Sequence, residues 1–514
     1  MNNNAVISPF IRSTPEEQGI SSRDILHFLE MVGRNALGHV KQELRGFAVL
    51  RNGKMVAEGA YAPYRLDQPG KLFSLSKSFA ATAVGLAVHE GLLTLDDRVI
   101  SFFSEFDAQS ASPNLAAMRV RHLLTMSTGH GEDTLTALFD GGANWSDTFL
   151  SLPVMHVPGT HFVYNSGASY MLSAILQRLT GQPLREYLIP RLFAPLQIEV
   201  PEWERCPSGE DAGGYGLRLS TIDIAKFGQL YLQDGIWDGK RLLPEGWVED
   251  ASRMHISNGD NAHNDWEQGY GYQLWRCKYP SAYRADGAYG QFCLIIPEKE
   301  AVIAMTCAVT NEAGQLMLDL VWKHLLQAMQ SAPLPADDEA EKALRARLGN
   351  LCIPLPKSFT TQPPAGWAER VCNYRMRPNG SGCSAVGFAF SAGECVLTLE
   401  GEGDVCQIPI GLGRWVDSRI PFPRSLATQW GYTAWPGDSV AIGELIPVSS
   451  GCWWQTDGSL LLQLRFIDTP FYFTVGCGFY EDMLALRSDV NVFFQPTGAQ
   501  ILVGDRVHGA DDMR

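Results

Sequence analysis

The chain has 514 residues, of which 45% are hydrophobic and 19% are charged, a composition typical of globular rather than disordered proteins. This length exceeds what one hydrophobic core can organise and predicts two or three domains. The formal net charge of −15 argues against binding to nucleic acid or to an anionic membrane surface, because both need clustered lysine and arginine.

The N-terminal stretch lacks the basic segment followed by an apolar segment that marks a secretory signal. No uninterrupted apolar run reaches about 18 residues, because His89 and Glu90 break the nearest candidate, which begins at Phe79. The eleven cysteines are scattered, and none forms a CxxC pair or a cluster with histidine. We therefore expect a cytoplasmic protein with reduced thiols and without a disulfide framework, a metal site or a cofactor.

The first part of the chain alternates between strand-like and helical patterns. Apolar residues on one face of 25–32 predict a short amphipathic helix, and two apolar runs around Asn52-Gly53 predict a hairpin with a type I′ turn. Residues 74–89 predict a largely buried helix, and 115–190 predict further helices joined by loops.

Residues 221–232 predict one more helix, which Ser220 or Thr221 caps. Strands are expected in YGYQLW, QFCLIIP and AVIAMTCAV, and a helix over 316–329 follows them. Helices therefore lie mostly in the middle of residues 1–330, with strands towards both ends. This order predicts an α+β domain in which an antiparallel sheet, flanked by helices, is covered on one side by a helical lobe.

The C-terminal part of the chain changes character. Residues 331–366 are rich in proline and charge, and they predict a linker that carries one short helix. From 367 to 514, strand-like segments alternate with Gly, Pro and Asp and predict an all-β accessory domain, a small sandwich or barrel. This domain contains no motif with the spacing of catalytic residues, so a binding role for it stays open.

The first candidate for chemistry is the segment Ser74-Leu75-Ser76-Lys77. A serine and a lysine three residues apart lie on the same face of a helix, one turn apart. If the helix begins at Ser74, its hydroxyl and its free backbone N–H lie at the positive end of the helix dipole. Burial would lower the pKa of Lys77, and a neutral lysine can take the Ser74 proton. A capped helix with a surface lysine gives the same tetrad, so both interpretations stay open at this point.

Two other segments are ambiguous by themselves. Tyr164-Asn165-Ser166 follow a Pro-Gly turn and precede a helix, so their polar groups either face a cleft or cap that helix. Asp286-Gly287-Ala288 precede a strand, where the glycine either lets the backbone approach a substrate or forms a tight turn. Each segment alone favours the structural interpretation.

In their order and spacing, the three segments together resemble the serine β-lactamase and penicillin-binding protein superfamily. They are most similar to its class C β-lactamase-like branch, which holds esterases, D-aminopeptidases and 6-aminohexanoate-dimer hydrolases. The resemblance covers about residues 12–330 and extends to TPEEQGISSRDI, HEGLLTLDDRV, VRHLLTMSTG and AGGYGLRLSTIDIAKFGQLYL.

The resemblance implies that Ser74 is the nucleophile, Lys77 the general base and Tyr164 a proton relay. The backbone N–H groups of Ser74 and Ala288 would form the oxyanion hole. The two aromatic candidates among the substrate-binding residues could instead belong to the core, which is the commoner fate of such side chains. The residues expected to contact the substrate are Ser166, Gly287, Tyr270 and Trp275.

Two positions depart from the family pattern, since Ser166 replaces an asparagine and Ala285 replaces a lysine or histidine. That basic residue helps to hold a β-lactam carboxylate, so we do not expect β-lactamase activity, whereas acyl transfer from Ser74 remains possible. We therefore expect a serine hydrolase that cleaves an ester or amide bond of a small molecule. The alternatives are an acyltransferase that uses the same site and a penicillin-binding-like protein that binds a substrate or peptide with little turnover.

Overall fold

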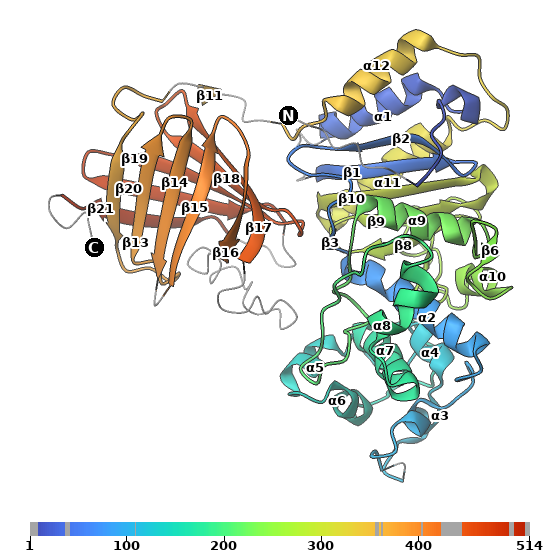
Figure 1. Cartoon of the computed structure of the whole chain (residues 1–514). Coiled ribbons are helices and arrows are strands. Elements are labelled where there is room, and N and C mark those ends of the chain that lie inside the picture. Colours follow the sequence, from blue (N-terminus) through green and yellow to red (C-terminus); the bar gives the residue numbers. More distant parts are fainter. Residues whose placement is uncertain are drawn as a thin grey trace. The chain divides into compact units, whose positions relative to one another are not determined.

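The structure is a computed structural model that describes residues 9–35, 42–107, 109–354, 359–360, 363–401, 404–422, 445–492 and 498–508 (Figure 1). The chain divides into two compact units, Met1–Leu351 and Cys352–Arg514. Among the helices described, none is long and apolar enough to cross a membrane.

The described part of the first unit is built on a six-stranded antiparallel sheet with the order β2-β1-β10-β9-β8-β7. At the predicted hairpin turn, Asn52 and Gly53 have φ values of 50° and 73°, as a type I′ turn requires. Strand β10 lies between β1 and β9, so the two ends of the unit meet in one sheet, as predicted. The strands are β1 (Gln42–Arg51), β2 (Lys54–Ala60), β7 (Trp275–Arg276), β8 (Tyr283–Gly287), β9 (Gln291–Ile296) and β10 (Ala301–Val309).

One face of this sheet is covered by helices from both ends of the unit (Figure 1). They are α1 (Ser22–Asn35), α11 (Asn311–Leu320), the π-helical η6 (Val321–Leu326) and α12 (Asp338–Gly349). The single helix expected over 316–329 is therefore the end of α11 followed by η6. Helix α12 lies in the stretch whose composition predicts a linker, and it packs on α1 and β2 with Ala340 and Leu344 buried.

The opposite face carries α9 (Thr221–Leu232), which contacts β1, β9 and β10 (Figure 1). Beyond α9 lies the helical lobe. Its central helix α2 (Ser76–His89) packs against α7 (Ser166–Thr180) and α8 (Leu184–Leu188), and α4 (Val120–Leu124) also packs on α7. Helix α2 is buried from Ser76 to Ala87, as expected of a helix that is apolar almost all round.

The remaining elements of the first unit are short. The helices are η1 (Glu16–Gln18), η2 (Phe73–Leu75), η3 (Val99–Phe102), α3 (Pro113–Ala117), α5 (Leu135–Asp140), α6 (Trp145–Ser151), η4 (Ile189–Phe193), α10 (Trp247–Ser252) and η5 (Pro297–Lys299). The strands are β3 (Gly70–Lys71), β4 (Arg218–Leu219), β5 (Ile236–Trp237) and β6 (Lys240–Arg241).

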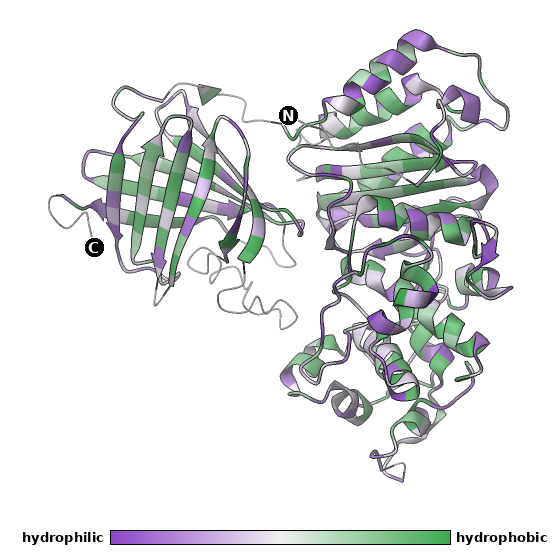
Figure 2. Cartoon of the chain, viewed as in Figure 1, coloured by the Kyte–Doolittle hydropathy of each residue, from purple (hydrophilic) through white to green (hydrophobic). Residues whose placement is uncertain are grey.

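The described part of the second unit consists of strands in the order β11-β17-β15-β14-β13-β12-β21-β20-β19-β18, and β17 also pairs with β18 and so closes the sheet on itself. Along β13 and β14 buried residues alternate with more exposed ones. Figure 2 shows bands of different hydropathy on the strands of this unit. The expected α+β architecture with an all-β C-terminal domain is therefore confirmed. The strands are β11 (Phe359–Thr360), β12 (Val371–Met376), β13 (Ala385–Ser391), β14 (Glu394–Gly401), β15 (Asp404–Leu412), β16 (Val416–Pro421), β17 (Leu445–Gln455), β18 (Leu460–Phe466), β19 (Tyr472–Phe479), β20 (Met483–Val490) and β21 (Gln500–Arg506).

Candidate active site

Ser74 lies in the 3-10 turn η2, directly before the central helix α2. The prediction that the α-helix begins at Ser74 is wrong, because α2 begins at Ser76, after this turn. Phe73, which precedes the serine, has a φ of 50°, a left-handed conformation that costs a residue other than glycine about 1–2 kcal/mol. The backbone thus turns sharply at Ser74, whose side chain is partly exposed at the start of the helix.

Lys77 is buried, with 1% of its surface exposed, and its amine is surrounded by oxygen atoms. Its Nζ lies 3.2 Å from Ser74 Oγ, 3.2 Å from Ser166 Oγ and 2.7 Å from the Gly214 carbonyl oxygen. Burial lowers the pKa of Lys77 to about 8, and the nearby Asp133 carboxylate partly opposes that shift. An amine with this pKa is partly neutral near pH 8 and can accept a proton.

Tyr164 lies against both of these residues. Its hydroxyl interacts with the Ser74 side chain, which partly opposes the effect of burial on the pKa of Tyr164, and its ring centroid lies 4.9 Å from Lys77 Nζ. Burial raises the pKa of Tyr164 well above its usual value, so its hydroxyl stays protonated at neutral pH. The structure therefore brings together three side chains from η2, α2 and the segment before α7.

The N-terminus of α7 is fixed by a loop that the sequence did not single out. Asn165 caps α7, and its Oδ1 accepts a hydrogen bond of 2.8 Å from Thr134 Oγ1. The adjacent Asp133 accepts hydrogen bonds from the backbone N–H of Ser166 (2.8 Å) and from its hydroxyl (3.1 Å). Gly167 leaves room for the Thr134 side chain to reach Asn165, since a Cβ at position 167 would lie 2.0 Å from Thr134 Oγ1. The loop thus holds Ser166 beside Lys77.

The third segment brings β8 close to the nucleophile. A Cβ on Gly287 would lie 2.0 Å from the carbonyl oxygen of Leu72, so only glycine lets this strand approach the turn before Ser74. Ala288 follows directly and is partly exposed, whereas Ala285 is completely buried. The backbone segments of Ser74 and Ala288 are therefore neighbours.

The basic side chain on β8 is Arg284, which is buried and forms an ion pair inside the protein. Its guanidinium is completely buried and pairs with Asp286, with Nε 2.8 Å from Oδ2. It also lies 4.7 Å from the ring centroid of Trp266 and 5.8 Å from that of Trp275. The charge of Arg284 is therefore balanced within the protein.

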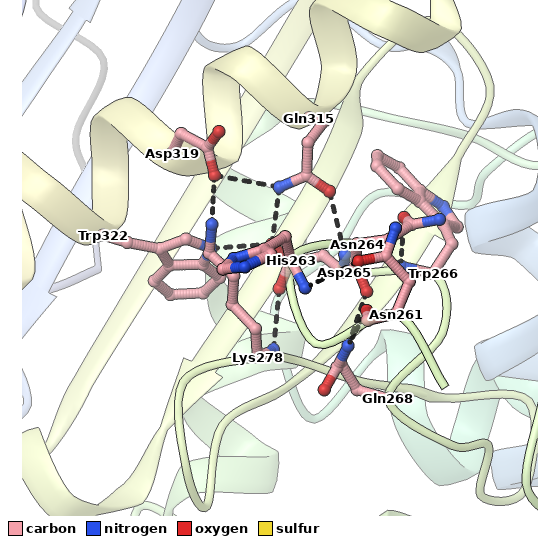
Figure 3. Close-up of polar contacts among 10 residues, drawn as sticks. All are labelled: Asn261, His263, Asn264, Asp265, Trp266, Gln268, Lys278, Gln315, Asp319 and Trp322. Carbon is pink, nitrogen blue, oxygen red and sulfur yellow. Dashed lines mark hydrogen bonds and ion pairs between the residues drawn. The ribbon is translucent and has the colours of Figure 1, made fainter. Parts of the chain in front are cut away.

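Arg284 is held in turn by the buried Asp265. The Asp265 carbonyl accepts a hydrogen bond of 2.9 Å from Arg284 Nη1. Its carboxylate accepts three more, from the Lys278 backbone N–H (2.9 Å), Gln315 Nε2 (2.8 Å) and Trp322 Nε1 (2.9 Å). Figure 3 shows these donors converging on Asp265, so the loop that carries it is tied to α11 and η6.

Tyr270 and Trp275, expected to contact a substrate, lie beside Tyr164 but are mostly packed. Tyr270 is 1% exposed and Trp275 is 9% exposed, and the Trp275 ring stacks on Tyr164 at 5.3 Å between centroids. Phe162 and Trp266 pack against this cluster and are partly exposed. An apolar wall therefore stands next to the three candidate catalytic groups.

The first unit, which contains this site, is similar to known proteins. The family described as beta-lactamase matches residues 37–326. A 6-aminohexanoate-dimer hydrolase of Paenarthrobacter ureafaciens is 27% identical over 219 residues, which are 40% of this chain and 55% of that protein. Esterase EstB of Burkholderia gladioli is 31% identical over 150 residues, which are 26% of this chain and 38% of that protein. The matched region thus spans about half the length of these relatives or less.

A candidate 6-aminohexanoate-dimer hydrolase from Bacillus anthracis has a solved structure that matches with a TM-score of 0.51 at 21% identity, covering 65% of this chain and 91% of that one. At this identity the match shows the shared fold alone. The family match covers more than half of the 514 residues and includes Ser74, Lys77 and Tyr164. As the three segments predicted, this chain belongs to the beta-lactamase family of serine hydrolases.

Proposed function

We propose that this protein hydrolyses an ester or amide bond of a small molecule through an acyl-enzyme on Ser74. The observation that carries the proposal is the buried amine of Lys77, which lies 3.2 Å from Ser74 Oγ and has a pKa of about 8. Neutral Lys77 takes the Ser74 proton as Oγ attacks the carbonyl carbon. Tyr164, whose hydroxyl interacts with the Ser74 side chain, gives a proton to the leaving group as the tetrahedral intermediate collapses and takes one from Lys77 in return.

The backbone N–H groups of Ser74 and Ala288 would stabilise the oxyanion of that intermediate. Each well-aimed donor of this kind is worth about 3 kcal/mol. The close approach of Gly287 to the turn before Ser74 supports this pairing of donors. Water then attacks the acyl carbon, gives one proton to the Lys77–Tyr164 pair and releases the acid, and Ser74 regains its proton.

The charges of the site favour a substrate without an anionic group near its acyl part. Lys77 and Arg284 are its described basic side chains, and Arg284 pairs with Asp286. Asp133 adds an exposed negative charge beside Ser166. The partly exposed rings of Phe162 and Trp266 suit an apolar acyl group. We therefore propose a neutral, apolar ester or amide as the substrate class.

Substitution of Ser74 tests the proposal directly. Ser74→Ala should abolish hydrolysis of short p-nitrophenyl esters while the circular dichroism spectrum stays unchanged. A fluorophosphonate probe should add its mass to the peptide that contains Ser74 in the wild type and to no peptide in the variant. Retention of more than about a hundredth of the wild-type rate would remove Ser74 as the nucleophile.

A further inference from the structure

Ser166 raises a question of hydrogen-bond direction. An asparagine at this position would offer Lys77 an amide oxygen, which can only accept, whereas the Ser166 hydroxyl can either donate or accept. A neutral lysine carries two N–H groups and one lone pair. For Lys77 to act as a base on Ser74, its lone pair must face Ser74 and both N–H groups must find acceptors elsewhere.

The surroundings of Lys77 supply two such acceptors only under one condition. The Gly214 carbonyl, 2.7 Å from Nζ, accepts one N–H. Ser166 Oγ, 3.2 Å from Nζ, accepts the second only if its own proton points away from Lys77. The other polar partner of that hydroxyl is Asp133 Oδ2, at 3.1 Å. Because an ionised carboxylate cannot donate, the Ser166 proton points to Asp133.

We infer that Asp133 is a positioning residue, which fixes the Ser166 hydroxyl as an acceptor for Lys77 and so leaves the lysine lone pair free for Ser74. Asp133 and Ser166 together would then do what a single asparagine amide does. The inference rests on the proposed function of Ser74 and Lys77 and extends it to a residue that touches neither Ser74 nor the reacting atoms.

The local structure holds Asp133 in place for this role. Its Oδ1 accepts hydrogen bonds from the backbone N–H groups of Ser166 (2.8 Å) and Leu135 (3.1 Å). Thr134, the next residue, is hydrogen-bonded to the cap of α7 through Asn165. The carboxylate is thus fixed by two backbone donors from two segments, and its second oxygen lies within hydrogen-bond distance of the Ser166 hydroxyl.

The decisive variant is Asp133→Asn, which nearly preserves shape. Its Oδ1 can still accept from both backbone N–H groups, but its Nδ2 faces Ser166 Oγ and donates. The Ser166 proton then turns towards the Lys77 lone pair. We expect kcat for p-nitrophenyl acetate to fall about tenfold to a hundredfold, the range that misplaced catalytic groups produce. Asp133→Glu, which keeps a carboxylate, should recover part of this loss.

A double-mutant cycle with Ser166→Asn separates hydrogen-bond direction from structure and charge. An asparagine at 166 presents its amide oxygen to Lys77 whatever stands at 133. The loss caused by Asp133→Asn should therefore shrink at least tenfold in the Ser166→Asn background. Glu132→Gln, which removes an exposed charge one residue away, is the matched control and should leave kcat unchanged.

The pH dependence of kcat/KM independently measures how the charge of Asp133 affects the pKa of Lys77. Asp133 and Tyr164 are the titratable groups next to Lys77 in the described site, and the Asp133 charge raises the lysine pKa. Asp133→Asn should move the acidic limb of kcat/KM to lower pH in both backgrounds. Circular dichroism and thermal unfolding confirm that each variant folds.

Equal losses of kcat in the two backgrounds, or no loss with Ser166 present, would overturn the inference. If the Asp133→Asn variant fails to fold, the Asp133→Glu variant becomes the test. Partial activity of Asp133→Glu would support the role of the carboxylate as acceptor for the Ser166 hydroxyl, and complete inactivity would contradict it. Residual activity of Ser74→Ala in the same assays would instead remove the proposed function itself, and the inference with it.

Discussion

The ring of Phe73 packs edge to face on the ring of Tyr289, with centroids 5.2 Å apart and an interplanar angle of 74°. Both residues have positive φ, 50° and 65°, which is uncommon outside glycine. Phe73 directly precedes Ser74, and Tyr289 directly follows Ala288. The ring pair therefore joins the two backbone segments whose N–H groups we propose as the oxyanion hole.

Phe73→Ala should destabilise the protein by about 3 kcal/mol and also lower kcat for a small ester about tenfold or more. The stability loss follows from the buried ring, and the rate loss follows from a looser alignment of the Ser74 and Ala288 N–H groups. Urea unfolding and steady-state kinetics measure the two effects. If Tyr289→Ala and Phe73→Ala lower kcat independently, so that the double variant shows the product of both losses, the rings do not act as one unit.

The pH dependence of the reaction should follow Lys77. Because the base must be neutral and burial lowers the pKa of Lys77 to about 8, kcat/KM should rise with pH and reach half its maximum near pH 8. Lys77→Arg should remain charged at every accessible pH and be inactive. Hydrolysis of an uncharged p-nitrophenyl ester between pH 5 and 10 checks this, after subtraction of the spontaneous rate. A rate independent of pH would exclude Lys77 as the base.

Local sequence patterns predicted the sheet and the lobe, because each has a periodicity. The resemblance to the serine β-lactamase superfamily, rather than any one motif, identified the segments that carry Ser74, Lys77 and Tyr164. Neither could predict Asp133, which lies in a loop without a motif and acquires its role only by contact with Ser166, 33 residues later. The 3-10 turn at Ser74 also depends on tertiary structure, since the Leu72 carbonyl packs against Gly287 of β8. Proline and charge around α12 predicted a linker, while Ala340 and Leu344, four residues apart, are buried on this helix, which packs on α1 and β2.

Penicillins and cephalosporins should be very poor substrates. Ala285 is completely buried and uncharged where the family carries a basic residue, and Arg284 is paired with Asp286. An anionic acyl group would also meet the negative charge of Asp133. We expect p-nitrophenyl butyrate to be hydrolysed at least about tenfold faster than its analogue with a terminal carboxylate, and nitrocefin turnover to be negligible. Nitrocefin turnover comparable to that of the neutral ester would contradict the proposed substrate class.

The second unit should be an accessory to the reaction, and truncation at two positions tests this. A chain that ends at Leu351 keeps α12, whose buried Ala340 and Leu344 lie on the face packed against α1 and β2. It should fold and hydrolyse p-nitrophenyl acetate at the rate of the full chain, because Ser74, Lys77 and Tyr164 all belong to the first unit. A chain that ends at Met329 loses α12, exposes the apolar surface beneath it, and should unfold at a lower temperature.

Small and bulky substrates then distinguish the possible roles of the second unit. If the chain that ends at Leu351 keeps its fold but loses activity on the acetate, a residue beyond 351 takes part in the reaction and the accessory role is wrong. If only long-chain or aromatic esters change in kcat/KM, the second unit selects substrates, which is the outcome we expect. Because the acetate is too small to need an extended binding surface, its rate isolates the chemistry of Ser74 from recognition of the rest of the substrate.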